Sequence, residues 1–188
     1  FDQNRQVFGI EGGINPNYPY ANAALFAQGL DAWPGDTGEK GWGLAFNGGL
    51  RQLGWQLGGS TQFLSSAVNG TELALGPQWS VNLNPVVILG ELDFKQNFTH
   101  KRSTLAGYTE VNWLMTWGLS GSLKFEYIDP DMSLKDDHKN RIALGATFHP
   151  YSHIELQAEY RQTFTGGTVF LIQSQLTSHE LLVMVHTW

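Results

Sequence analysis

Charged or polar side chains recur at every second position in several stretches of the sequence, and the charged ones are its main candidates for chemistry. Three such stretches are Glu91-Leu-Asp-Phe-Lys95, Lys124-Phe-Glu126 and Glu155-Leu-Gln-Ala-Glu-Tyr-Arg161. Successive side chains of a β-strand point to opposite faces, so each stretch would present charges on one face and apolar groups on the other. Such a polar face either contacts water or forms a network of cross-strand ion pairs.

A hydrolytic site would need a nucleophile, a base and an orienting acid close together. The nearest grouping of this kind is Ser178-His179-Glu180, and no second grouping supports it. We therefore predict no catalytic residues and expect that the chain is not an enzyme. The competing hypothesis of a lipid or peptide hydrolase depends on Ser178 and His179.

Metal and cofactor sites are also not expected. His149 and His153 flank a short turn and could share a metal ion, but no carboxylate is patterned with them. Aspartates beside one connection could bind a divalent cation or form a solvated acidic loop; they are Asp129, Asp131, Asp136 and Asp137. The chain has no Cys, which removes thiolate ligands and covalent c-type haem attachment.

The composition indicates a surface that faces lipid. Only 15% of the 188 residues are charged, aromatic residues reach 13%, and there are 22 glycines. No apolar run approaches the roughly 18 residues of a transmembrane helix. The net charge is −6 without a Lys/Arg cluster, so nucleic-acid binding is not expected.

Alternation of apolar and polar residues predicts an all-β chain of about eleven strands. The strands are expected at 5–13, 20–32, 42–50, 54–67, 71–83, 86–98, 105–116, 119–129, 141–149, 153–165 and 179–188. Counted back from the C-terminus, the connections alternate between longer and shorter, apart from a tight turn at Asn69-Gly70. Short turns on one side and longer loops on the other are typical of transmembrane barrels. We predict a single-domain, transmembrane, antiparallel up-and-down β-barrel over residues 1–188.

In such a barrel the apolar faces contact lipid and the polar faces point into a lumen. A Lys or Arg that faced lipid near the midplane would cost about 2–4 kcal/mol, which favours the inward direction. The predicted pore-lining residues are Glu91, Asp93, Lys95, Glu110, Asn112, Lys124, Glu126, Glu155, Glu159 and Arg161. It is also open whether these groups instead fill a narrow barrel as a packed ion-pair network.

Aromatic residues near the short turns predict one membrane interface. Trp and Tyr collect at bilayer interfaces because their rings are amphipathic. The predicted membrane-interface residues are Trp55, Trp79, Trp113, Trp117, Tyr151 and Trp188.

The last stretch, His179–Trp188, is a hydrophobic strand that ends on an aromatic residue, as a closing barrel strand would. Single-chain bacterial barrels generally have an even number of strands and both termini in the periplasm. Eleven strands do not satisfy this rule, so an even total of 12 or more and an N-terminally incomplete chain are expected.

Several segments then suggest a family. They are Glu110-Val-Asn-Trp113, Gly118-Leu-Ser-Gly-Ser-Leu-Lys-Phe-Glu-Tyr-Ile-Asp-Pro130, Arg141-Ile-Ala-Leu-Gly-Ala-Thr-Phe-His-Pro150 and Ile154–Arg161. Together they resemble the C-terminal part of Gram-negative outer-membrane porin-like barrels. Such barrels usually end in Phe, where this chain has Trp188, and His186 and Glu180 depart from the apolar pattern of their last strand.

The resemblance implies an outer-membrane location, with membrane lipid and the barrel insertion machinery as partners. Some similar barrels form the porin sheath of porin–cytochrome conduits, so a multihaem cytochrome is a further expected partner. The expected function is a channel for small solutes or a scaffold that encloses a partner. An outer-membrane hydrolase and a soluble ligand-binding β-barrel are the competing hypotheses.

Overall fold

The computed structural model describes residues 7–28, 40–67, 70–166 and 176–187, and within them every regular element is a β-strand. The strands are β1 (Val7–Ile14), β2 (Pro19–Gln28), β3 (Gly41–Gln52), β4 (Trp55–Ser66), β5 (Gly70–Asn82), β6 (Val86–Asn97), β7 (Arg102–Thr116), β8 (Leu119–Asp129), β9 (Lys139–Tyr151), β10 (Ile154–Thr165) and β11 (Leu176–Thr187). Among the described residues, no helix is long and apolar enough to cross a membrane.

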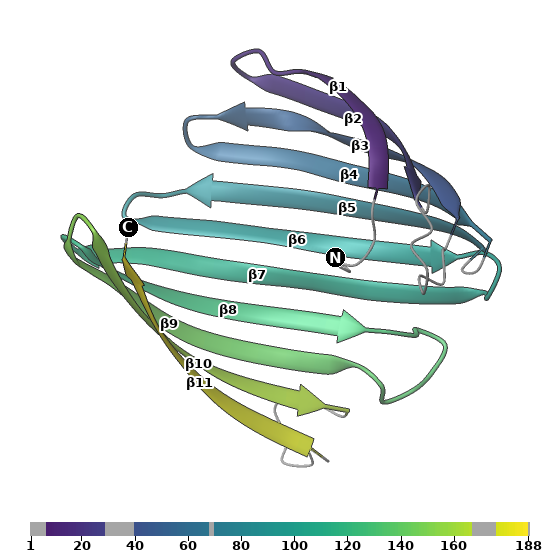
Figure 1. The fold of residues 1–188 in the computed structure, drawn as a ribbon. Helices are drawn as coiled ribbons and strands as arrows, with labels where there is room; N and C mark the ends of the chain where they lie inside the picture. The colour runs from purple at the N-terminus through teal and green to yellow at the C-terminus, as the bar shows by residue number, and fades with distance from the viewer. Residues whose placement is uncertain (1–6, 29–39, 68–69, 167–175, 188) are drawn as a thin grey trace.

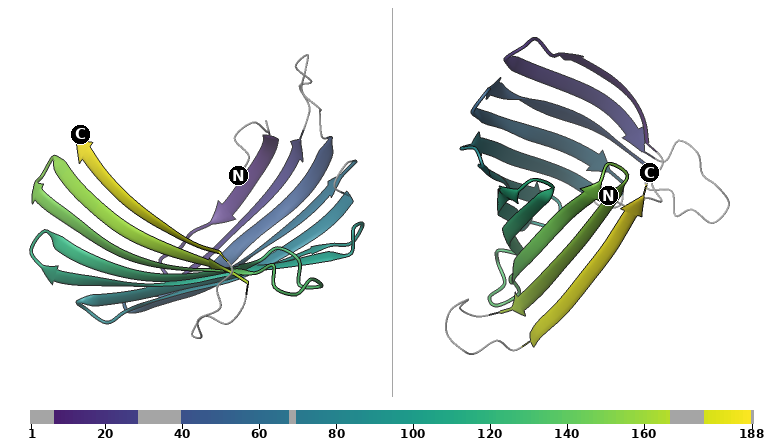
Figure 2. Two further views of the ribbon diagram at one scale, coloured as in Figure 1. Left: turned by 90° about the horizontal axis from the view of Figure 1, so that it is seen from below. Right: turned by 90° about the vertical axis from the view of Figure 1, so that its left-hand side faces the viewer.

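The eleven strands form one antiparallel sheet in which the strand order follows the chain order (Figure 1). This arrangement confirms the predicted all-β, up-and-down architecture. The sheet is strongly curved into a trough, with β1 and β11 at its two edges (Figure 2). These edge strands do not pair with one another in the described residues.

Most predicted strands match an observed strand to within a few residues. The largest differences within the described residues are at β7, which begins at Arg102 and not at 105, and at β11, which begins at Leu176 and not at 179. The predicted strand 20–32 corresponds to β2, which ends at Gln28, and residues 29–32 lie outside the described residues. Pairing with a neighbouring strand lengthens β9 at both ends, from 141–149 to Lys139–Tyr151.

The connections confirm the predicted alternation. At one end of the sheet, here called the short-turn end, the strands are joined by residues 15–18, 53–54, 83–85, 117–118 and 152–153. At the opposite, long-connection end they are joined by residues 29–40, 67–69, 98–101, 130–138 and 166–175. The segment 67–69 is as short as the turns of the other end, which is the exception that the Asn69-Gly70 pair predicts.

The sheet has two exposed faces and almost no buried core. Leu64 and Ala143 are the only buried hydrophobic residues in the described part of the chain. Large apolar side chains cover one face, here called the apolar face, and they include Ile10 on β1, Leu44 on β3, Leu123 on β8, Leu144 on β9 and Leu181 on β11. These side chains are between 48% and 73% exposed, so the described part of the chain does not cover them.

Candidate functional site

The opposite, polar face carries the charged side chains and is hollowed by several cavities, including two that differ in their lining. The first, of about 370 Å³, is here called the charged cavity; its lining includes Glu110, Asn112, Ser122, Lys124, Glu126, Arg141, Gln157, Glu159 and Arg161. The second, of about 610 Å³, is here called the small-residue cavity; its lining includes Glu11, Asn22, Ala24, Ala45, Ser60, Ala74, Asp93, Lys95 and Ala106. The second lining runs from β1 to β7, so the polar face is the concave side of the trough.

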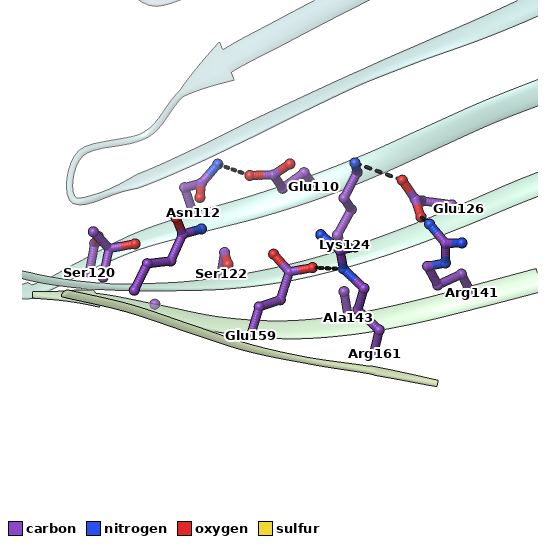
Figure 3. A pocket seen from close by; sticks show the side chains of 13 residues that line it. Glu110, Asn112, Ser120, Ser122, Lys124, Glu126, Arg141, Ala143, Glu159 and Arg161 are labelled. Carbon is purple, nitrogen blue, oxygen red and sulfur yellow. Dashed lines mark hydrogen bonds and ion pairs between the residues drawn. The ribbon is translucent and has the colours of Figure 1, made fainter. Parts of the chain in front are cut away.

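An ion-pair network crosses the charged cavity from β8 to β9 (Figure 3). The ammonium group of Lys124 lies 2.7 Å from one carboxylate oxygen of Glu126. The other oxygen of Glu126 accepts a 3.1 Å hydrogen bond from Nη1 of Arg141. Antiparallel register explains the second contact, because Glu126 and Arg141 are cross-strand partners. One carboxylate therefore contacts two cations.

The network continues on the neighbouring strands. On β10, Nε of Arg161 donates a hydrogen bond to Glu159. The cross-strand partner of Arg161 on β11 is Glu180. On β7, Glu110 accepts a 2.8 Å hydrogen bond from the amide of Asn112 and is paired in register with Lys124. Each basic side chain of this wall thus has an acidic neighbour.

Strands β5 and β6 carry a second, smaller group of charges. Lys95 lies 2.7 Å from Glu72, whose other carboxylate oxygen accepts a 2.9 Å hydrogen bond from Asn97. Glu91 and Asp93 follow on the same face of β6, and neither forms an ion pair within the described residues. The charges of β6 are therefore only partly compensated.

At the short-turn end a tyrosine ring lies across the polar face. The hydroxyl of Tyr20 accepts hydrogen bonds from Gln56, at 3.2 Å, and from Gln78, at 2.9 Å. The guanidinium of Arg51 lies 5.6 Å from the centre of the same ring. A Cβ at Gly58 would sit 2.5 Å from the Tyr20 hydroxyl, so glycine is what lets the ring cross the sheet there.

The histidine prediction needs a correction, because a carboxylate does accompany His149. Nε2 of His149 lies 3.4 Å from Glu155 on β10, and Glu155 is in turn the cross-strand partner of His186. The hairpin brings His149 and Glu155 together, and a register shift between Ile154 and Leu156 accompanies it. No group of three or more potential metal ligands is found in the described part of the chain.

The register of β11 also explains the two departures from the apolar pattern. Glu180 and His186 lie opposite Arg161 and Glu155, which places both on the polar face. The intervening residues Leu181, Val183 and Val185 form the exposed apolar face of the strand. The alternation is thus kept on the apolar face, and Trp188 lies outside the described residues.

The Ser178-His179-Glu180 grouping is split between the two faces. The hydroxyl of Tyr160 and Nδ1 of His179 lie 2.6 Å apart, and the two rings stack on the apolar face. Glu180 lies opposite Arg161 on the polar face, and alternation places Ser178 there as well. These three residues therefore do not form a nucleophile, base and acid arrangement.

At the long-connection end, the segment 130–138 is folded against the start of β7. The hydroxyl and amide of Ser133 donate hydrogen bonds to Asp131, at 2.7 and 3.1 Å. These bonds hold the pKa of Asp131 below its ordinary value, and Arg102, whose Nε lies 3.6 Å from Oδ2 of Asp131, lowers it further. Met132 adds a 2.9 Å backbone hydrogen bond to Ser103, so the acidic segment is anchored to the sheet.

The structure places all the predicted pore-lining residues on the concave polar face. Sequence reasoning missed Arg141, Glu72 and Glu180, which pair with predicted residues or lie opposite them. Arg141 could have been found from its alternation with Ile142, but the predicted strand only begins at that residue. The predicted interface aromatics within the described residues, Trp55, Trp79, Trp113, Trp117 and Tyr151, all lie toward the short-turn end.

The role of Glu126 in holding the network leads to a stability prediction. Glu126→Gln keeps the shape of the side chain but leaves Lys124 and Arg141 without their shared carboxylate. Since all three side chains are partly exposed, we expect a loss of about 1 kcal/mol of unfolding free energy, measured by urea titration in lipid vesicles. Glu91→Gln is the matched control, because Glu91 has no ion pair in the described residues. Equal losses for the two variants would contradict the network.

Comparison with known proteins gives one result about the fold. No family model and no curated protein matches the sequence. A solved structure of NanC porin, in a rhombohedral crystal form, is similar with a TM-score of 0.54 and 10% sequence identity, and the match covers 98% of this chain and 92% of that chain. At this identity the similarity shows a porin-like β-barrel fold and carries no information about solute or partner.

Proposed function

We propose that the chain forms a porin-like channel in the outer membrane of a Gram-negative bacterium and passes small hydrophilic solutes. The observation that carries the proposal is the separation of the two faces of one curved sheet. The concave face holds the ion pairs, the charged cavity and the small-residue cavity, while the convex face exposes large apolar side chains. Lipid on one side and water on the other would satisfy both surfaces.

The dimensions of the strands support the same proposal. A tilted transmembrane strand needs about 9–11 residues, and β2 to β11 have between 10 and 15. Aromatic side chains toward the short-turn end, such as Trp55 and Trp113, would lie at one membrane interface. In the usual orientation of such barrels this end faces the periplasm, and the longer connections face outward.

An enzymatic role is not part of this proposal, since Ser178 and His179 lie on opposite faces of β11. Enclosure of a multihaem cytochrome remains the other role that a polar lumen could serve. The two roles make different demands on the lumen, because an enclosed partner would leave little free path for ions.

A bilayer recording tests the proposal. We expect the detergent-purified full-length protein to migrate faster on a gel before heating than after, and to produce discrete conductance steps in a planar bilayer. Failure of a folded, heat-modifiable protein to conduct ions would contradict the channel. Co-purification with a haem-staining protein, with no conductance, would support the enclosing role.

A further inference from the structure

We infer that the lumen prefers small cations to anions, and that Glu91 and Asp93 on β6 supply the charge responsible. The inference rests on the proposed function, because it names the class of ion that the channel would favour. It follows from the way in which the charges of the polar face are paired.

The cationic side chains in the middle of the polar face are all engaged. Lys95 contacts Glu72, Lys124 and Arg141 share Glu126, and Arg161 contacts Glu159. Nearer the strand ends, Arg51 donates to Asn15 and lies over Tyr20, and Arg102 lies 3.6 Å from Asp131. An anion in the middle of the lumen would therefore have to compete with a carboxylate for each of the four central bases.

The carboxylates are not matched in the same way. Glu91 and Asp93 are neighbours on one face of β6, and no base lies within ion-pair distance of either in the part of the chain that the structure describes. Their cross-strand partners are uncharged: Gln78 and Tyr108 lie opposite Glu91, and Ala106 lies opposite Asp93. These two side chains leave negative charge that the protein does not neutralise.

Small neighbours leave Asp93 accessible to the lumen. The Oδ1 atom of Asp93 lies over Gly76, in the space that a Cβ would occupy, so a larger residue at position 76 would displace the carboxylate. Asp93 is exposed and lies on the wall of the small-residue cavity, among Ala74 and Ala106. A passing ion could approach the carboxylate without moving a long side chain.

Acidic residues also predominate when all the charged residues of the polar face are counted. Carboxylates outnumber bases along the strands: the acids are Glu11, Glu72, Glu91, Asp93, Glu110, Glu126, Glu155, Glu159 and Glu180. The bases are Lys95, Lys124, Arg141 and Arg161, with Arg51, Arg102 and Lys139 toward the strand ends. Uncompensated charge of one sign in a narrow, low-dielectric passage concentrates ions of the opposite sign.

The reversal potential in a KCl gradient tests the inference. We expect the full-length protein to favour K⁺ over Cl⁻ by roughly fivefold at 0.1 M salt, and the preference to decline at 1 M, where the Debye length falls to about 3 Å. The double variant E91Q/D93N should lose most of this preference while it still conducts. Both changes are close to isosteric, and heat-dependent gel mobility checks that the variant is folded.

The matched control removes one negative charge that does not lie on the wall of the lumen. Asp136→Asn acts in the exposed segment 130–138, and it should leave the permeability ratio unchanged, whereas Asp93→Asn alone should lower it. An unselective or anion-selective native channel would overturn the inference without affecting the proposed channel. A double variant that kept the full preference would overturn the assignment to Glu91 and Asp93. A folded protein that conducts no ions would overturn the proposed function and this inference together.

Discussion

Replacement of Leu123 by Arg is expected to lower the stability of the protein in a bilayer by about 2–4 kcal/mol, or to prevent its insertion. Leu123 lies near the middle of β8 on the apolar face, where it is 48% exposed and is the cross-strand partner of Leu144 and Val111. If this face contacts hydrocarbon, a guanidinium at position 123 would have to leave water without gaining a partner. Urea titration in lipid vesicles, followed by Trp fluorescence, measures the change.

The adjacent residue provides the control for this experiment. Ser122 lines the charged cavity on the opposite face, so Ser122→Arg places the same group on the polar face. We expect it to cost much less than Leu123→Arg. If the two variants were equally stable, or if the order were reversed, the assignment of the apolar face to lipid would be wrong.

Replacement of Gly58 by Val is expected to destabilise the protein by about 1–3 kcal/mol, the usual cost of forcing extra methyl groups into an occupied space. The new Cβ would lie 2.5 Å from the Tyr20 hydroxyl and 3.0 Å from the carbonyl oxygen of Gly48. Tyr20 would have to move and would lose its hydrogen bonds from Gln56 and Gln78. The same urea titration reports the loss.

The neighbouring glycine separates this effect from a general intolerance of Val in β4. A Cβ at Gly59 would lie no closer than 3.5 Å to any atom, so Gly59→Val should have little effect. The Tyr20→Ala background provides a second test, because Gly58→Val should lower the free energy of unfolding by less once the ring is absent. An unchanged cost in that background would show that Tyr20 is not the group that position 58 must avoid.

The strands were predictable because their signal is local. Alternation in stretches such as Val86–Asn97 and Ile154–Thr165, with turn residues between them, determines both the strand and the face that each side chain takes. The same alternation placed Glu91 and Lys124 correctly on a polar face. Local sequence patterns do not predict the curvature of the sheet or the positions of the cavities.

The partners of the charged residues could not be predicted, because they depend on the register between strands. A shift of one residue in pairing would move every side chain to the other face, and the sheet contains irregularities at Leu114/Thr116 and Ile154/Leu156. Two ion pairs can be identified only once the pairing of the strands is known: His149 with Glu155, and Arg141 with Glu126. The same register determines which carboxylates lack an ion pair in the described residues, Glu91 and Asp93 among them.

The matching of strand order to chain order has a consequence for how the protein assembles. In the described residues each strand pairs only with its neighbours along the chain, so the contact order is low and each turn costs little loop-closure entropy. Hairpins can then be added one at a time along the chain. The hydrogen bond between Tyr20 and Gln78 is different, because it joins residues 58 positions apart. It can form only when β2 to β5 already lie side by side, so its formation indicates that this part of the sheet is complete.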